Sequence, residues 1–202
     1  PRWFAAKGGW TNPDSPELFA RYCDKTMRHL GREIDHLITF NEPNIMRILV
    51  AVGLPSQVWD LQRAMLTEAA RQTGGTKFAA LNAVNPEDIE PMQVVLMKAH
   101  SLGKVAIKAV RSDLPVGVSL AMFDDQAVGK NSIRDAMRQK LYGGWIDLAK
   151  KDDFLGVQNY ERAVWNDKGR VAPSPGGDRG HMGAEVYPPS LAGAVRLFGE
   201  QL

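Results

Sequence analysis

The sequence holds a single cysteine, Cys23, among its 202 residues. With one thiol, no disulfide can form within the chain. The histidines are also few and scattered, without the regular spacing of metal ligands. They are His29, His36, His100 and His181. Cys23 is therefore predicted to be a buried structural thiol, and neither a metal ion nor an organic cofactor is expected.

Long apolar runs and blocks of like charge are missing as well. No apolar stretch approaches the roughly 18 to 20 residues that cross a bilayer, and nothing near Pro1 resembles a signal peptide. The 25 basic and 23 acidic residues are dispersed and give a net charge of +2, without the basic block typical of phosphate binding. We therefore expect a soluble chain with no membrane and no nucleic-acid partner. Its cellular location and oligomeric state stay open, with the cytoplasm favoured.

What is present is the composition of an ordinary globular protein. Hydrophobic residues make up 44% of the chain and charged residues 24%, which is enough apolar material for one sizeable core. One domain is expected. The chain begins with Pro1 rather than Met and ends at Gln201-Leu202 within an unfinished helical pattern, which suggests a fragment.

Hydrophobic periodicity predicts helices that alternate with short strands. Ser15 is expected to cap the first helix, and Gly31 to end it in the left-handed conformation. The sequence predicts helices over 16–30, 59–70, 85–111 and 132–148 and from Ser190 onward, strands over 34–40, 115–120 and 154–160, and a loop over 167–189. Strands separated by helices of ten or more residues pair in parallel. The fold class is α/β, and three strands suit a piece of a larger sheet.

Polar residues follow two of these strands, where parallel sheets carry their functional groups. Asn41 and Glu42 end the first strand, and Gln158 to Glu161 end the third. A carboxylic acid beside an amide can protonate a glycosidic oxygen while the amide holds a sugar hydroxyl. On these residues alone, a simple polar turn before Pro43 is favoured over a catalytic site.

The wider context of Glu42 changes that balance. Thr39-Phe40-Asn41-Glu42-Pro43-Asn44 resembles the acid/base signature of glycoside hydrolase family 1, the β-glucosidases and their relatives. Other segments resemble the family in the same order along the chain. They are Pro1–Phe4 with Gly8–Trp10, Asp14–Leu30, Ala99–Val110, Asp153–Tyr160 and Gly183–Pro189.

The resemblance implies a fragment of a (β/α)8 TIM barrel, about strands 4 to 6 with flanking helices. Residues 1–202 would form one partial domain that lacks the N- and C-terminal parts of the barrel. The implied activity is that of a retaining β-glycosidase, a β-glucosidase in the first instance, which hydrolyses terminal β-linked sugars in a small-molecule β-glycoside.

The resemblance also implies roles for individual residues. Glu42 would be the general acid/base, and Asn41 would bind the sugar 2-hydroxyl. Tyr160 matches a tyrosine that contacts the nucleophilic carboxylate in the family. Gln158 is a departure, because Gln158-Asn159-Tyr160 stands where the family has Asn-Tyr-Tyr, and its substrate-binding role is correspondingly open.

The family's nucleophile would follow strand seven, beyond Leu202, so the isolated chain is expected to be inactive. Two alternatives remain: a sugar-binding barrel that has lost catalysis, and a cellulase-like glycosidase with the same barrel. A carboxylate at the end of strand seven would favour an enzyme over the binding protein.

Other residues that could carry chemistry are given structural roles. The acidic pairs Asp124-Asp125 and Asp152-Asp153 are expected in solvated turns. The tryptophans at 10, 145 and 165 are expected to cover core, and His100 is expected to be a satisfied core histidine.

Overall fold

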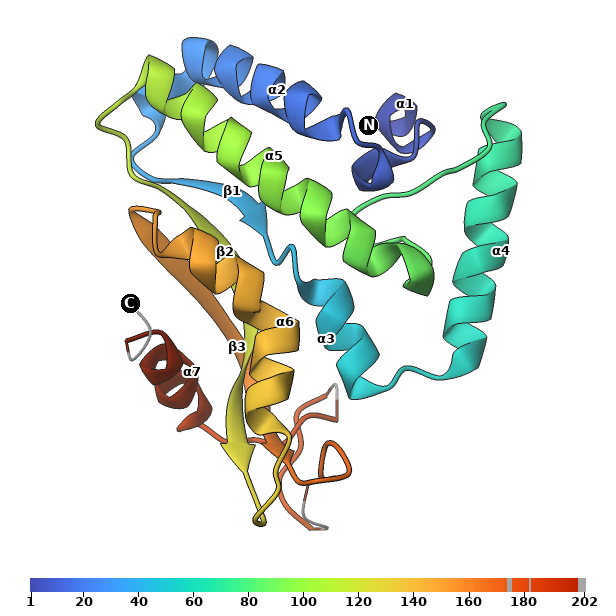
Figure 1. The fold of residues 1–202 in the computed structure, drawn as a ribbon, viewed down its shortest axis with the longest axis vertical. Helices are drawn as coiled ribbons and strands as arrows, with labels where there is room; N and C mark the ends of the chain where they lie inside the picture. Colours follow the sequence, from blue (N-terminus) through green and yellow to red (C-terminus); the bar gives the residue numbers. More distant parts are fainter. Residues whose placement is uncertain (174–175, 182, 200–202) are drawn as a thin grey trace.

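The computed structural model describes residues 1–173, 176–181 and 183–199, in which helices alternate with the strands of one sheet (Figure 1). The helices are α1 (Arg2–Ala5), α2 (Ser15–Leu30), α3 (Ile45–Val52), α4 (Ser56–Gln72), α5 (Ile89–Val110), α6 (Arg134–Ala149) and α7 (Ser190–Gly199). The strands are β1 (Leu37–Asn41), β2 (Val116–Ala127) and β3 (Phe154–Trp165). Gln201 and Leu202, predicted to continue the last helix, lie outside the described residues.

The three strands form a parallel sheet in the order β1-β2-β3. Asn41 of β1 pairs with Ser119 of β2, and Ala121 of β2 pairs with Gln158 of β3. The middle strand is buried from Val116 to Asp125, as expected for a parallel strand with neighbours on both sides. The predicted α/β class and the parallel pairing are confirmed.

Helices cover the sheet and enclose one main core. Helix α5 packs on α2 and β1, while α6 and α7 both contact β2 and β3. Helix α4 stands to the side of the sheet (Figure 1). The core contains Val118 and Leu120 of β2, Leu96 of α5 and Trp145 of α6. No helix in the described part of the chain has both the length and the apolarity to cross a membrane.

The ends of α2 differ from the prediction in detail. Ser15 is the first helical residue, and its hydroxyl donates to the Gly9 carbonyl at 2.7 Å instead of capping the helix. Gly31 has a φ of −59°, so it is not left-handed but opens a short 3₁₀ turn. The residue is buried, and a Cβ there would lie 2.8 Å from the terminal methyl group of Met27, which would have to move to admit it.

Helix α3 was not predicted. Its eight residues, Ile45–Val52, are apolar except for Arg47, and a segment this short with one polar position is a weak signal for a helical period. The helix stops at Gly53, whose φ of 78° is left-handed.

Several single residues have the structural roles that were expected. His100 is 1% exposed and forms hydrogen bonds through Nδ1 with the Thr39 hydroxyl and through Nε2 with Asp152. Trp145 and Trp165 are buried in the core. Cys23 is buried, and this burial raises the pKa of its thiol to about 11.

The expectation of solvated acidic pairs was wrong for three of the four carboxylates. Asp152 has a buried side chain because His100 and Lys104 supply its partners, the latter at 2.8 Å. Asp124 and Asp125 are buried because β2 continues past its predicted end at residue 120. Asp153 is exposed and pairs with Lys108.

Asp125 lies on β2, next to Trp165 of β3 and Arg138 of α6. Its Oδ1 accepts a hydrogen bond from the Trp165 indole at 2.6 Å, and its Oδ2 lies 4.0 Å from Arg138 Nε. Burial raises the pKa of Asp125 from 3.8 to about 6. The hydrogen bonds from Trp165 and Tyr142 and the charge of Arg138 lower this pKa, but by less than burial raises it. The site thus binds a proton more tightly in the folded than in the unfolded state.

This shift predicts that Asp125 lowers stability at neutral pH. Since its folded pKa is the higher one, its contribution makes the free energy of unfolding fall as pH rises from about 4 to about 6. Asp125→Asn keeps an oxygen for Trp165 but removes the buried charge. In urea unfolding it should match the unmodified chain near pH 4 and exceed it at pH 7 by up to about 3 kcal/mol.

The matched control is Asp147→Asn, at an exposed position of α6, which should change little at either pH. An Asp125→Asn chain less stable than the unmodified chain at pH 7 would contradict the prediction.

Candidate active site

The site is built on the three residues between β1 and α3, which are Glu42, Pro43 and Asn44. Glu42 has a φ of 50°, the one positive value outside glycine among the described residues. Left-handed backbone at such a residue costs on the order of 1 to 3 kcal/mol and persists only when its surroundings hold it. Two backbone hydrogen bonds do so: Glu42 N donates to the Ser119 carbonyl at 2.7 Å, and its carbonyl accepts from Ile45 N at 3.0 Å.

Asn44 holds the far end of this segment. Its side-chain amide donates to the Ala121 carbonyl at 2.8 Å and accepts from Ala121 N at 3.1 Å. Asn44 is fully buried, so water does not compete for these bonds. The backbone of β1 stops pairing with β2 at Asn41, and beyond that point the Asn44 side chain bonds to β2 in its place. We call these two hydrogen bonds the Asn44 clamp.

A second buried amide holds Pro43. Gln93 of α5 donates to the Pro43 carbonyl at 2.8 Å and accepts from the Trp145 indole of α6 at 2.7 Å. Both helices behind the sheet therefore contribute to fixing the turn. The polar turn that the sequence favoured on local grounds is present, but it is rigidly placed.

The side chains of the site meet across all three strands. Tyr160 donates its hydroxyl to Glu42 Oε1 at 2.5 Å. Gln158 Nε2 donates to Asn41 Oδ1 at 2.6 Å and to Ser119 Oγ at 2.7 Å. Asn41 is exposed and the Tyr160 side chain is 62% exposed. The group therefore lies on an open face at the C-terminal ends of the strands.

The contact between Glu42 and Tyr160 has an electrostatic consequence. The hydrogen bond to Glu42, helped by partial burial and by the carboxylate charge, raises the pKa of Tyr160 to about 12. The phenol therefore stays a donor throughout the physiological range. It fixes one carboxylate oxygen and leaves the other available to a ligand.

All four predicted site residues, Asn41, Glu42, Gln158 and Tyr160, thus lie together. The family resemblance implied that the Tyr160 hydroxyl would contact a nucleophilic carboxylate, whereas here it contacts Glu42.

Asn159 is turned away from this group. Its amide donates to the Met122 carbonyl at 3.0 Å and accepts from the Ser190 hydroxyl at 2.7 Å. It therefore attaches the start of α7 to β3.

Sequence reasoning missed Ser119 and Gln93 and gave Asn44 no separate role. Ser119 lies within a predicted apolar strand, and Gln93 in a predicted helix. Neither has a motif, because their partners are distant in sequence. The one local sign of a role for Ser119 is that a hydroxyl residue stands among the apolar residues of a buried strand.

The arrangement suits proton transfer to a bound oxygen. A carboxyl group oriented by a phenol can exchange a proton with a ligand, while the neighbouring amides bind hydroxyl groups. In the part of the chain that the structure describes, no group of three or more His, Cys, Asp or Glu is placed to hold a metal ion.

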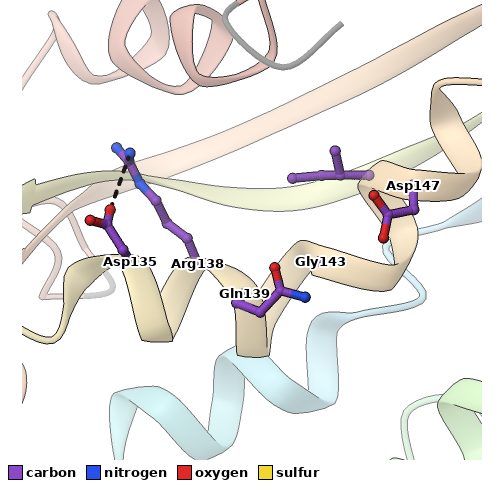
Figure 2. A pocket seen from close by; sticks show the side chains of 6 residues that line it. Asp135, Arg138, Gln139, Gly143 and Asp147 are labelled. Atoms are coloured by element: carbon purple, nitrogen blue, oxygen red, sulfur yellow. Dashed lines mark ion pairs between the residues drawn. The ribbon is translucent and has the colours of Figure 1, made fainter.

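Hollows in the surface lie apart from Glu42. Figure 2 shows one of about 190 Å³ on α6, where Arg138 lies 3.9 Å from Asp135. Another, of about 310 Å³, is lined by aromatic residues near the N-terminus, including Trp3 and Tyr22. A third, of about 360 Å³, adjoins Tyr160 between β3 and the start of α7. None of these three hollows includes the Glu42 carboxylate, and the site is defined by its hydrogen bonds.

Comparison with known proteins agrees with this geometry. The sequence model described as "Glycosyl hydrolase family 1" matches residues 1–56, which include the turn at Glu42. The whole chain is similar to the apo structure of a β-glucosidase 1317, at 30% identity with a TM-score of 0.91, covering 100% of this chain and 49% of that one. A second match is β-glycosidase BGL167, at 33% identity with a TM-score of 0.82, covering 99% of this chain and 48% of that one.

A more distant structure shares the fold. The β-glucosidase from Pyrococcus furiosus is 22% identical, with a TM-score of 0.65, and covers 95% of this chain and 40% of that one. The present chain therefore spans about half the length, or less, of the solved structures it matches.

The fold is that of an α/β protein, a parallel sheet with helices, similar to β-glucosidase barrels. The predicted resemblance to glycoside hydrolase family 1 is confirmed.

The Asn44 clamp gives a stability prediction. Asn44→Ala leaves the N–H and C=O of Ala121 buried without partners, at a cost of about 1 to 3 kcal/mol for each group. We expect a total loss of about 3 kcal/mol in the free energy of unfolding, measured by urea titration and circular dichroism. Asn131→Ala, at an exposed position, is the control and should stay within about 0.5 kcal/mol. Equal effects of the two changes would show that the clamp does not hold the fold.

The Tyr160 contact gives a titration prediction. Glu42→Gln removes the carboxylate that raises the Tyr160 pKa, so this pKa should fall from about 12 toward its ordinary value of 10.0. Ultraviolet absorbance of the phenolate measures the change, and Tyr160→Phe identifies its signal. Glu161→Gln is the control, because Glu161 pairs with Arg170 at 2.6 Å instead. A Tyr160 pKa that stays near 12 in Glu42→Gln would disprove the contact.

Proposed function

We propose that this chain is the middle part of a retaining β-glycosidase, a β-glucosidase in the first instance, that hydrolyses terminal β-linked sugars. Residues 1–202 form one partial (β/α)8 domain, with β1, β2 and β3 as barrel strands four to six. The observation that carries the proposal is the left-handed Glu42, with its carboxylate held by Tyr160 beside the Asn41 and Gln158 amides. The match of residues 1–56 to the family supports the same assignment.

In this proposal Glu42 acts twice. It first protonates the glycosidic oxygen as the leaving group departs, and then, as a carboxylate, it removes a proton from the attacking water. The phenol of Tyr160 keeps the carboxylate pointed across the strand ends. Asn41 binds the sugar 2-hydroxyl, an interaction that strengthens as positive charge develops at the anomeric carbon.

A retaining reaction also needs a nucleophilic carboxylate about 5 to 5.5 Å from the acid/base. In this proposal that group stands on a barrel strand after β3, as the family resemblance implies. We therefore propose that the 202-residue chain alone is inactive and that catalysis belongs to the complete protein. A complete protein without a carboxylate at that place would instead be a sugar-binding barrel.

The acid role predicts a dependence on the leaving group. In the complete protein, Glu42→Gln should reduce hydrolysis of alkyl β-glucosides by about 100- to 10,000-fold, the usual contribution of general acid catalysis. Aryl glucosides whose phenols leave without protonation should lose far less in the glycosylation step. Pre-steady-state release of the phenol measures that step.

Glu33→Gln, at an exposed position, is the control and should behave as wild type with both substrates. Equal losses for poor and good leaving groups in Glu42→Gln would rule out the acid role.

A further inference from the structure

We infer that Ser119 is a positioning residue for the sugar contact of Asn41 and that it acts through Gln158. This inference rests on the proposed function and extends it to a residue that touches no substrate. The three side chains form a continuous row, one from each strand, linked by the two hydrogen bonds that Gln158 Nε2 donates.

The direction of the Gln158 amide is fixed by its two hydrogen atoms. An NH₂ group has two N–H bonds, and here one goes to Asn41 Oδ1 at 2.6 Å and the other to Ser119 Oγ at 2.7 Å. If the amide were reversed, its oxygen would face the Asn41 oxygen. A serine hydroxyl can donate as well as accept, so Ser119 holds the Gln158 amide in place beside Asn41. The Tyr160 hydroxyl, which donates to Gln158 Oε1 at 3.5 Å, favours the orientation in which the NH₂ group faces Asn41.

The direction of the Asn41 amide follows from that of Gln158. Because Asn41 Oδ1 accepts from Gln158, its Nδ2 is the group left to face a ligand. Asn41 is exposed, so this NH₂ group is accessible. It would donate to the oxygen of a sugar hydroxyl, and a reversed amide would present an acceptor instead.

Packing limits where the Ser119 hydroxyl can point. Ser119 is 3% exposed, and it lies beside Gly156 of β3, with which it is paired in the sheet. A Cβ at Gly156 would lie 2.7 Å from Ser119 Oγ, so the absence of a side chain there makes room for the hydroxyl. The Ser119 carbonyl also accepts a hydrogen bond from Glu42 N. Ser119 therefore contacts both Glu42 and Gln158.

The length of Gln158 fits this arrangement. Its α-carbon partner on β2 is Ala121, while Asn41 lies one strand further, opposite Ser119. Neighbouring strands are about 4.8 Å apart, so the side chain must extend over β2 to reach β1. The residue that departs from the family pattern is therefore the one whose extra methylene makes this bridge, with Ser119 as its support.

The test compares two substrates in the complete protein. Ser119→Ala removes the hydroxyl, and the Gln158 amide loses one of its two fixed partners. For an aryl β-glucoside we expect kcat/KM to fall about tenfold, the effect of one hydrogen bond of about 1.4 kcal/mol. For the matching 2-deoxy-β-glucoside, which lacks the hydroxyl that Asn41 binds, we expect less than a twofold change.

Two further variants complete the design. Ser101→Ala is the control, since the Ser101 hydroxyl donates to the Met97 carbonyl within α5 at 3.1 Å, away from the site, and both substrates should be unaffected. Gln158→Glu replaces the donor group by an acceptor and should give the same selective loss, which keeps the test available if Ser119→Ala does not fold.

The outcomes separate this inference from the proposed function. Equal losses on both substrates, or no loss on either, in Ser119→Ala and Gln158→Glu would overturn the positioning role while wild-type hydrolysis and the Glu42→Gln defect stand. A complete protein that hydrolyses no β-glycoside would instead remove the proposed function, and this inference with it. A loss confined to the substrate with the 2-hydroxyl supports it.

Discussion

The Asn44 clamp is the interaction on which the site depends most. Strand β1 is only five residues long, Leu37–Asn41, and its backbone leaves the sheet at the point where the functional residues begin. By bonding to both backbone groups of Ala121, Asn44 returns the chain to β2. Glu42 lies between the last pair of the strand and this clamp, and so its backbone is restrained at both ends. Restraint of that kind is what allows a residue other than glycine to keep a left-handed conformation.

The helices behind the sheet reinforce this arrangement without contributing reactive groups. Gln93 and Trp145 extend a line of buried hydrogen bonds from Pro43 into α5 and α6. Another buried residue of α5, His100, joins Thr39 of β1 to Asp152, which lies just before β3. Buried polar groups of this kind are costly unless every member is paired. These buried side chains thus link β1, the turn after it and the start of β3 to the helices that cover the sheet.

Much of the fold could be predicted because apolar runs and helix signals are local. The parallel α/β order followed from the spacing of three apolar strands and the helices between them. The strand ends could not be predicted, since Asp124, Asp125 and Arg162 look like loop residues. They are tolerated in strands because Trp165 bonds to Asp125, and Glu185 bonds to Arg162 at 2.6 Å. Those partners come from elsewhere in the chain.

The site shows the same division. Asn41, Glu42, Gln158 and Tyr160 could be named because they follow predicted strands and match a family signature. Ser119 could not, because its importance comes from contacts with residues on β1 and β3, 39 positions away in the case of Gln158. Sequence pattern identifies groups that carry charge or an amide at a strand end. It does not identify the small buried residues that determine how those groups are turned.

The left-handed backbone of Glu42 also bears on how this position would change over generations. Glycine adopts a φ of 50° without strain, and asparagine does so more readily than glutamate. A copy of the protein released from selection for activity would gain stability by replacing Glu42, so mutation and selection for folding would act in the same direction there. The carboxylate is thus held against the preference of its own backbone, and its loss would be an early mark of a lineage that no longer uses the site.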